Sequence, residues 1–194
     1  FTILEGFTAM ILQPNLSKIV RHIQLGTLDF ILLKPVSSQF WLSFRQFSPW
    51  GIPSVLVGII ISIYGLYNSS SIINVTSILC TVIMVISSFV TLYSLWFILA
   101  TTSIWFVKVW NVNEVLKSIL IAGRFPVSSY PSFVRIIFTF IIPIAFLTTI
   151  PAEAILGKLT INWFISSIVI SFLFLTISIL FWKLALRYYT SASS

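Results

Sequence analysis

The side chains that could perform chemistry are few in this chain of 194 residues. It has one histidine, His22, one cysteine, Cys80, and four acidic residues. A Ser-His-Asp hydrolase would need His22 to converge with a serine and an aspartate, and Asp29 lies only seven residues away in the same polar stretch. The sequence contains neither a GxxxxGK[ST] phosphate loop nor a Cys/His set with the spacing of a zinc site. The sequence therefore disfavours a hydrolase, a protein that holds a metal ion and a protein that binds ATP through a phosphate loop.

The composition is that of an integral membrane protein. Hydrophobic residues make up 58% of the chain, charged residues only 8%, and the mean hydropathy is +1.09. A soluble domain carries about 25% charged residues. The net charge of +7 comes from basic residues that flank apolar runs, which is typical of topology signals and lipid headgroup contacts. Because no nucleic-acid-binding signature accompanies the charge, we expect no nucleic acid partner.

The elements that must position these residues are membrane-spanning helices. A bilayer core requires about 20 apolar residues in helical form. The apolar runs predict four complete spans at residues 50–67, 73–99, 133–150 and 159–182, and residues 1–12 have the composition of the end of an earlier span. We therefore expect an all-α, polytopic helical bundle that forms a single transmembrane domain over residues 1–194, with an upstream part missing.

The connections between these spans alternate in charge. Residues 68–72 carry no basic residue and residues 151–158 carry one, whereas residues 13–49, residues 108–135 and the tail are basic. By the positive-inside rule, the basic connections and the C-terminus are cytoplasmic. The basic residues of these connections are Lys18, Arg21, Lys34, Arg45, Lys108, Lys117, Arg124, Arg135, Lys183 and Arg187.

Three connecting stretches have helical patterns too short to span. In residues 17–34, Ser17 is expected to cap a first short helix, Gly26 to end it, and Asp29 to lie near the start of a second. Residues 109–120 are amphipathic, with Glu114 and Lys117 spaced to pair, and predict an interfacial helix in lipid or against a partner.

The third short stretch is expected at the outer face of the membrane. Pro151 suits the first turn of a helix, Glu153 lies near the positive end of its dipole, and Gly157 is the expected stop. The segment is expected either to lie on the outer surface or to dip back into the membrane.

The stretch "IQLGTLDFILLKPV", residues 23–36, resembles a known loop pattern, I-x-x-G-x-L-D-x-x-L-L-[RK]-P. This pattern belongs to permease subunits of type-two ABC exporters, in the branch often described as uncharacterised ABC transport permeases. The stretch "RFPVSSYPSFVRIIFTFIIPIAFLTTIPAEAILG", the spacing between the two stretches and the ending "WKLALRYYTSAS" are similar to the same branch. The resemblance covers nearly the whole chain in order.

The resemblance implies a permease subunit that pairs with a second permease, identical or paralogous, and with separate cytoplasmic ATPase subunits. ATP and Mg²⁺ would be bound by the ATPase, and this chain would hold no cofactor. A coupling helix in the loop between the second and third spans would seat in the ATPase. The positions that match the loop pattern are Gly26, Leu28, Asp29, Leu32, Leu33, Lys34 and Pro35.

Two other functions remain open from the sequence. A non-transporting membrane scaffold or assembly factor could bind a soluble partner through the same loops. A membrane enzyme that acts on lipid would require titratable side chains grouped at one depth, and the predicted complete spans contain none at their centres. The expected location is the bacterial cytoplasmic membrane. Neither the substrate nor, apart from the resemblance, the direction of transport follows from the residues.

Overall fold

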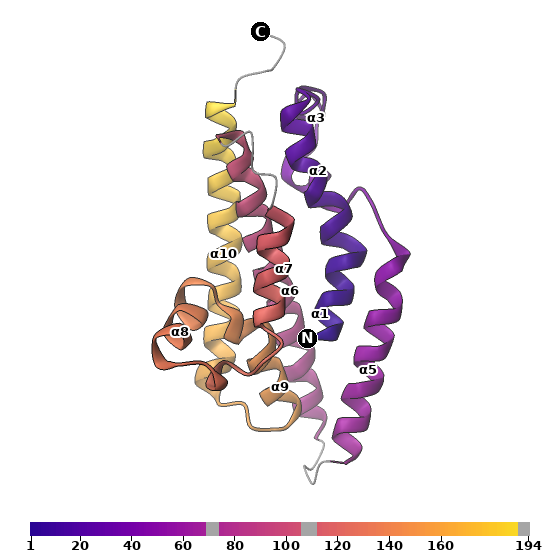
Figure 1. Cartoon of the computed structure of the whole chain (residues 1–194), viewed down its shortest axis with the longest axis vertical. Helices are drawn as coiled ribbons and strands as arrows, with labels where there is room; N and C mark the ends of the chain where they lie inside the picture. The colour runs from indigo at the N-terminus through magenta and orange to yellow at the C-terminus, as the bar shows by residue number, and fades with distance from the viewer. Residues whose placement is uncertain (69–73, 106–111, 190–194) are drawn as a thin grey trace.

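The computed structural model describes residues 1–68, 74–105 and 112–189, and this part of the chain forms helices and turns without any strand. Figure 1 shows an upright bundle with α3 and the C-terminal end of α10 at one end, called here the tip end, and the C-terminal end of α5 at the other, the far end. The all-α bundle expected from the sequence is confirmed. The helices are α1 (Thr2–Phe7), α2 (Gln13–Gln24), α3 (Asp29–Leu32), α4 (Ser38–Phe44), α5 (Ile52–Tyr67), α6 (Val75–Thr101), α7 (Val112–Ala122), α8 (Ser132–Ile136), α9 (Ile150–Ile155) and α10 (Ile161–Tyr188).

A π-helical turn joins α1 to α2, so that the first rod of the bundle is continuous. The prediction that Ser17 caps a separate helix is therefore wrong. Ser17 lies inside α2 and donates its hydroxyl to the carbonyl of Gln13 at 2.5 Å. The apolar side chains of this rod recur at the spacing of one helical face and are buried. They are Leu12, Leu16, Ile19 and Ile23.

The helix α5 packs against α1 through glycines. A methyl group added at Gly6 would lie 2.6 Å from Cγ2 of Val55, and one added at Gly58 would lie 2.7 Å from Cγ1 of Ile3. Small residues let helices in a membrane approach closely enough for their backbones to pack. Since Gly58 lies near the middle of α5, this contact also places the start of α1 level with the middle of that helix.

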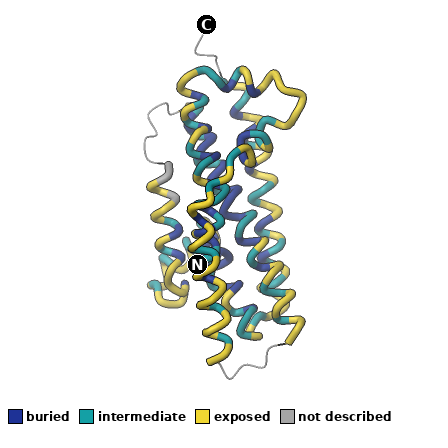
Figure 2. Tube along the Cα trace, turned by 90° about the vertical axis from the view of Figure 1, so that its right-hand side faces the viewer, coloured by how far each residue is buried: buried dark blue, intermediate teal, exposed yellow. Residues whose placement is uncertain are grey.

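The core of the bundle is built around α6, against which both the first rod and α10 pack. Trp96 and Phe97 of α6 are buried, and the ring of Phe97 meets that of Trp182 on α10 edge to face, with ring centres 5.3 Å apart. Figure 2 shows the buried residues along the middle of the bundle, whereas α5, nearest the viewer, is largely exposed. The exposed surface of α5 is apolar, which is expected of a helix that faces lipid.

Within the described residues, three helices are long and apolar enough to cross a membrane, namely Pro49–Tyr67, Val75–Ile104 and Ile161–Tyr188. They occupy the segments predicted as spans at residues 50–67, 73–99 and 159–182, and residues 69–73 lie outside the described residues.

The predicted span at residues 133–150 falls on a bent pair of helices, which forms either a broken span or a re-entrant loop. Two helical pieces, Ser132–Ile141 and Ala145–Ile155, meet at an angle of 75°. The break falls at Ile142, which is extended because the following residue, Pro143, disfavours helical geometry before it. Ser88 of α6 donates its hydroxyl to the carbonyl of Phe146 at 2.7 Å, which joins α6 to the second piece just beyond the bend.

The helix α7 covers the segment predicted to be an interfacial helix in lipid or against a partner. It runs beside α6 (Figure 1) and contacts α2 and α6, and its Leu120 is buried while Val115 is exposed. Glu114 and Lys117 do pair, with 2.9 Å between Oε1 and Nζ, and both are exposed.

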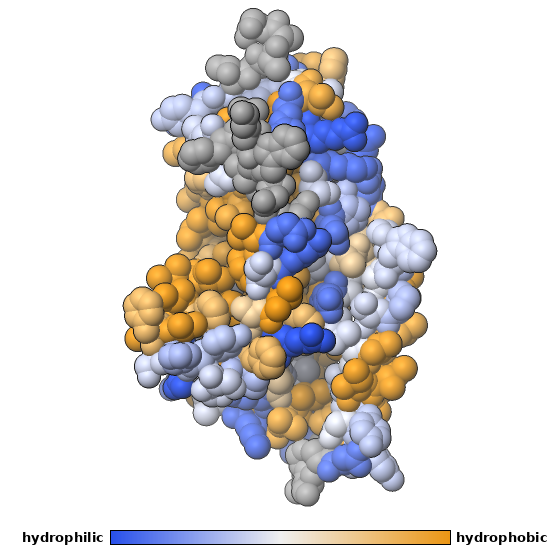
Figure 3. All heavy atoms as spheres, in the orientation of Figure 1, coloured by the Kyte–Doolittle hydropathy of each residue, from blue (hydrophilic) through white to orange (hydrophobic). Residues whose placement is uncertain are grey.

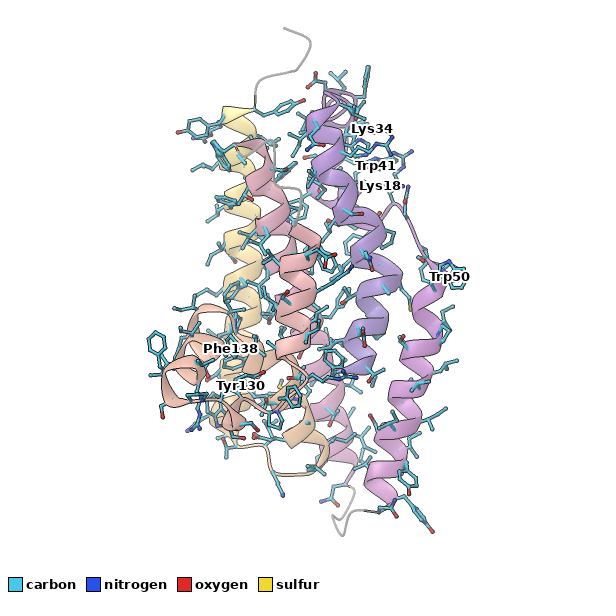
Figure 4. The ribbon with its side chains drawn as sticks, viewed as in Figure 1. Lys18, Lys34, Trp41, Trp50, Tyr130 and Phe138 are labelled. Carbon is cyan, nitrogen blue, oxygen red and sulfur yellow. The ribbon has the colours of Figure 1, made fainter. Side chains whose placement is uncertain are left out.

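The course of α7 also corrects the expected cytoplasmic connection over residues 108–135. The helix leads away from the tip end, and Figure 4 shows Tyr130 and Phe138, beyond it, at about the level of the middle of α5. Arg124 lies near the start of the chain, with its Cζ 5.7 Å from the ring centre of Phe1. The second half of that connection therefore does not lie at the tip end; Lys108 lies outside the described residues.

Candidate functional site

The tip, defined as residues 25–36, is a tight hairpin between α2 and α4 at the end of the bundle. Gly26 has a φ of +67°, a backbone conformation that glycine adopts at little cost. The turn is closed by backbone hydrogen bonds, in which Gly26 donates to Ile23 at 3.3 Å and Leu28 donates to His22 at 3.2 Å. The prediction that Gly26 ends the preceding helix is therefore confirmed.

The tip has an inner face and an outer face. Leu28 is fully buried and Ile31 is 4% exposed, so both side chains anchor the tip in the core. Phe30 is 70% exposed and Leu33 82%, and both belong to the outer face together with Leu32. The sequence pattern included Leu28 among the partner contacts, but Leu28 is buried and therefore anchors the tip instead. The pattern omitted Phe30, because that position is variable in the loop pattern.

Asp29 connects the tip to the end of α10. It is the first residue of α3, as the sequence predicted, and its carboxylate lies near the hydroxyl of Tyr189. Burial, followed by the negative charge of Asp29, raises the pKa of the Tyr189 hydroxyl above its ordinary value. At neutral pH this hydroxyl is therefore protonated.

Cations surround Trp41 on the side of the tip that faces α2 and α4. The Nζ atom of Lys34 lies 3.8 Å from the ring centre of Trp41, and Cζ of Arg45 lies 5.8 Å from it. Figure 4 shows Lys34, Trp41 and Lys18 one below the other beside α2. A cation over an indole ring gains about 0.5–1 kcal/mol at an exposed site, so this stacking helps to orient Lys34. Pro35 follows directly and is exposed.

His22 lies within this positive region rather than in open solvent. Its Nδ1 atom is 2.8 Å from the hydroxyl of Thr27. Partial burial, and then the charges of Arg45, Lys18 and Arg21, lower the pKa of His22 below its ordinary value. The imidazole is therefore neutral at physiological pH, and it contributes a hydrogen bond rather than a charge.

The helix α4 fixes the tip to the long helices through a polar network. Nε2 of Gln39 donates to the hydroxyl of Tyr93 on α6 at 3.2 Å and to that of Ser178 on α10 at 3.1 Å. The Tyr93 hydroxyl is also 2.9 Å from Oγ of Ser43, and Trp182 donates to Ser38 at 3.0 Å. No sequence motif marks these residues, because their partners lie far apart in the chain.

A second anchor joins α2 to the segment that follows α4. The amide of Asn15 donates to the carbonyl of Gln46 at 2.7 Å and accepts from its backbone N–H at 2.8 Å. Lys18 donates to the side chain of Gln46 at 2.6 Å. Both arms of the hairpin are therefore held, so a force on the tip would reach α2, α6 and α10 together.

The predicted short outer helix corresponds to α9. Pro151 lies in its first turn, as the sequence predicted, and a π-helical turn at Ala145–Thr149 runs directly into the helix. Glu153 lies in the first turn, and Gly157 follows the helix with a φ of +68°. The backbone N–H of Lys158 donates to the Glu153 carbonyl at 3.0 Å and closes this end.

Among the described residues, no group of three or more His, Cys, Asp or Glu side chains could hold a metal ion. The most distinctive feature of the described structure is the tip, a hairpin that is anchored in the core and has an exposed apolar face.

Comparison with known proteins agrees with the resemblance seen in the sequence. A family model described as "ABC-2 family transporter protein" matches residues 1–193. No curated protein and no solved structure matches the chain. Members of this family are membrane-embedded permease subunits, which serve transport and are not themselves catalytic. Because the match spans the chain from end to end, the protein belongs to the ABC-2 transporter family and is an integral membrane permease subunit.

Proposed function

We propose that this permease is driven by a separate cytoplasmic ATPase subunit, which binds ATP and Mg²⁺ and grips the tip. A second permease subunit completes the pathway, and the assembly exports its cargo across a bacterial cytoplasmic membrane. The coupling contact consists of the outer face of the tip, with Phe30, Leu32 and Leu33, together with the polar groups of Asp29 and Lys34.

The observation that carries this proposal is the exposure of large apolar side chains on a rigidly anchored hairpin. Phe30 and Leu33 project from the outermost turn of the bundle, while Leu28 and Ile31 hold that turn in the core. An exposed apolar cluster with buried anchors is expected of a surface that docks into a partner.

The charge distribution supports a cytoplasmic position for the tip end. Lys18, Lys34 and Arg45 belong to the hairpin and its arms, and Lys183 and Arg187 lie near the C-terminal end of α10. At the far end, the connection between α9 and α10 carries Lys158 alone among basic residues. Positively charged loops favour the cytoplasmic side, so both the tip and the C-terminus face the ATPase.

The test is recovery of the ATPase with the tagged full-length permease from native membranes. We expect the double variant Phe30→Asp/Leu33→Asp to recover at least about tenfold less ATPase, because each buried apolar side chain contributes about 1.5–3 kcal/mol. The amount of permease in the membrane should not change, since both side chains are exposed. The conservative pair Phe30→Leu/Leu33→Ile is the matched control and should retain the ATPase.

Recovery of no ATPase with the unaltered protein would instead favour a membrane scaffold, the second candidate function. That function would also use the exposed tip, but its partner would be a soluble protein that lacks a nucleotide site. Identification of the recovered partner by mass spectrometry separates the two.

A further inference from the structure

Arg124 is a cation at the depth of the membrane-spanning helices. Its Cζ atom lies 5.7 Å from the ring centre of Phe1. The adjoining residues Thr2 and Ile3 pack against Gly58, near the middle of α5, which is one of the three helices suited to cross a membrane. The guanidinium is therefore level with the middle of a span.

The backbone around Arg124 is also unusual for that depth. The helix α7 ends at Ala122, and residues 123–131 form an irregular loop that contains Pro126 and Pro131. The hydroxyl of Tyr130 donates to the carbonyl of Ala122 at 2.8 Å and satisfies one of the terminal groups of the helix. Irregular backbone at membrane depth is tolerated where it is buried in protein or lines a water-filled cavity. Arg124 and Phe125 are exposed, so this part of the loop is not buried within the chain.

Nothing in the described part of the chain neutralises this arginine. Its side chain is exposed and has no ion pair or hydrogen bond there, and its only contact of this kind is with the ring of Phe1. Arg135, by contrast, donates to the carbonyls of Ser128 and Tyr130. A charged arginine at the centre of a membrane helix costs about 2.5–3.5 kcal/mol on insertion scales, and such residues usually mark a path for a polar or charged species.

Polar residues continue along the same face. Figure 3 shows hydrophilic residues down the middle of this face, between hydrophobic surfaces on its left and right. Exposed polar residues also occur on α7 and α1, namely Glu5, Glu114, Lys117 and Ser118. Glu114 and Lys117 neutralise one another, which leaves Arg124 as the unpaired cation of α7 and its loop within the described residues.

From this placement we infer that Arg124 binds the anionic group of an amphipathic molecule on the transport route. The inference rests on the proposed transport function and adds a chemical class for the cargo, namely a negatively charged head with an apolar part. A guanidinium suits this role because it binds carboxylate or phosphate with two parallel hydrogen bonds. The simpler role, stabilisation of the C-terminal end of the α7 dipole, requires only a positive charge and no ligand.

The test uses the full-length permease in nanodiscs of phosphatidylcholine, with dansylaminoundecanoate as the anionic probe and its methyl ester as the neutral one. Probe fluorescence is titrated against the protein, with empty nanodiscs as the background. We expect the carboxylate to bind at least about tenfold more tightly than the ester, because charge-assisted hydrogen bonds form only with the anion. Arg124→Gln should abolish that difference, Arg124→Lys should keep part of it, and Arg187→Gln, an exposed cation on α10, should keep all of it.

A measurement on the unaltered protein covers the case in which Arg124→Gln fails to fold. Phenylglyoxal modification of Arg124, read by peptide mass spectrometry, should be slowed by the carboxylate probe and not by the ester. Equal affinity for the two probes, or equal modification with both, overturns the inference.

The source of the anion is resolved by adding phosphatidylglycerol to the nanodisc. Displacement of the probe by this lipid would identify a phospholipid headgroup as the natural ligand, and persistence of the probe would identify a separate cargo. Because the assay contains no ATPase, its outcome is independent of whether the tip grips one.

Discussion

Asp29 is the residue at which the candidate site combines charge with anchoring. Its carboxylate lies near Tyr189, so it links the first turn of α3 to the end of α10. The sequence indicated its importance through the loop pattern, but the partner at Tyr189 could not be predicted, because 160 positions separate the two residues. A charge in such a contact affects both the shape of the tip and its surface.

We expect Asp29→Lys to reduce transport-coupled ATP hydrolysis at least about tenfold, since a cation there loses the Tyr189 contact and reverses the charge presented to the ATPase. Asp29→Glu, which keeps the charge, should retain most of the activity. Hydrolysis by the reconstituted complex is the measurement, and the yield of inserted permease is the control. If Asp29→Lys and Gly26→Trp both support normal turnover, the tip is not the coupling element.

His22 predicts a pH dependence of stability. Its pKa is lowered in the folded protein, so below its ordinary value of 6.5 the unfolded chain binds a proton more readily than the folded one. The free energy of unfolding should therefore fall as the pH decreases from about 7.5 to about 5.5. The thermal midpoint in detergent should show a smaller decrease over this range for His22→Gln. Arg45→Gln should also make the decrease in the thermal midpoint smaller, because it removes one of the charges that disfavour protonation of His22. If both variants show the same decrease as the unaltered protein, His22 does not cause the pH dependence.

At the scale of elements, hydrophobic runs predicted the long helices well and the short ones poorly. The uncharged stretches that became α5, α6 and α10 have no alternative to a spanning helix, because lipid leaves no other partner for their backbone. Ser17 was mistaken for a cap, since a residue suited to begin a helix can also sit inside one if its hydroxyl bonds the preceding turn. Ser88 of another helix bonds the carbonyl of Phe146 just beyond the bend at Pro143, and local sequence does not show that contact.

The contact between α1 and α5 gives a prediction at this scale. Gly6→Val should destabilise the bundle by about 1–3 kcal/mol, because an added side chain would overlap Val55 and force the helices apart. Gly65→Val is the matched control, since a side chain there would meet nothing within 4 Å. Urea or heat unfolding in detergent would measure the difference, and equal loss in the two variants would rule out close packing as the cause.

At the scale of the whole molecule, the charge pattern distinguished the two ends of the bundle but misplaced part of the connection over residues 108–135. Residues 108–135 were assigned to a single cytoplasmic loop because they carry four basic residues. The structure leads α7 away from the tip end, so Arg124 lies beside Phe1 instead. A count of charges cannot distinguish a loop outside the membrane from one that enters it, because that depends on which helices cover the segment.

The orientation of the two ends can be measured directly. In a Cys80→Ser background, a cysteine at Asp29 should react with a membrane-impermeant maleimide only after the cells are opened. A cysteine at Lys158, beyond α9, should react from outside intact cells. Labelling of position 29 from outside would rule out an ATPase contact at the tip, whatever the reactivity of position 158.

The length of α10 has a mechanical consequence. The helix runs unbroken from Ile161 to Tyr188, which at 1.5 Å per residue is about 42 Å and comparable with the full thickness of a bilayer including its headgroups. Such a helix is stiff along its axis, and Tyr189 directly after it lies near Asp29. A tilt imposed on α10 at one surface of the membrane is therefore transmitted to the other surface by this single helix, and no chain of side-chain contacts is needed in between.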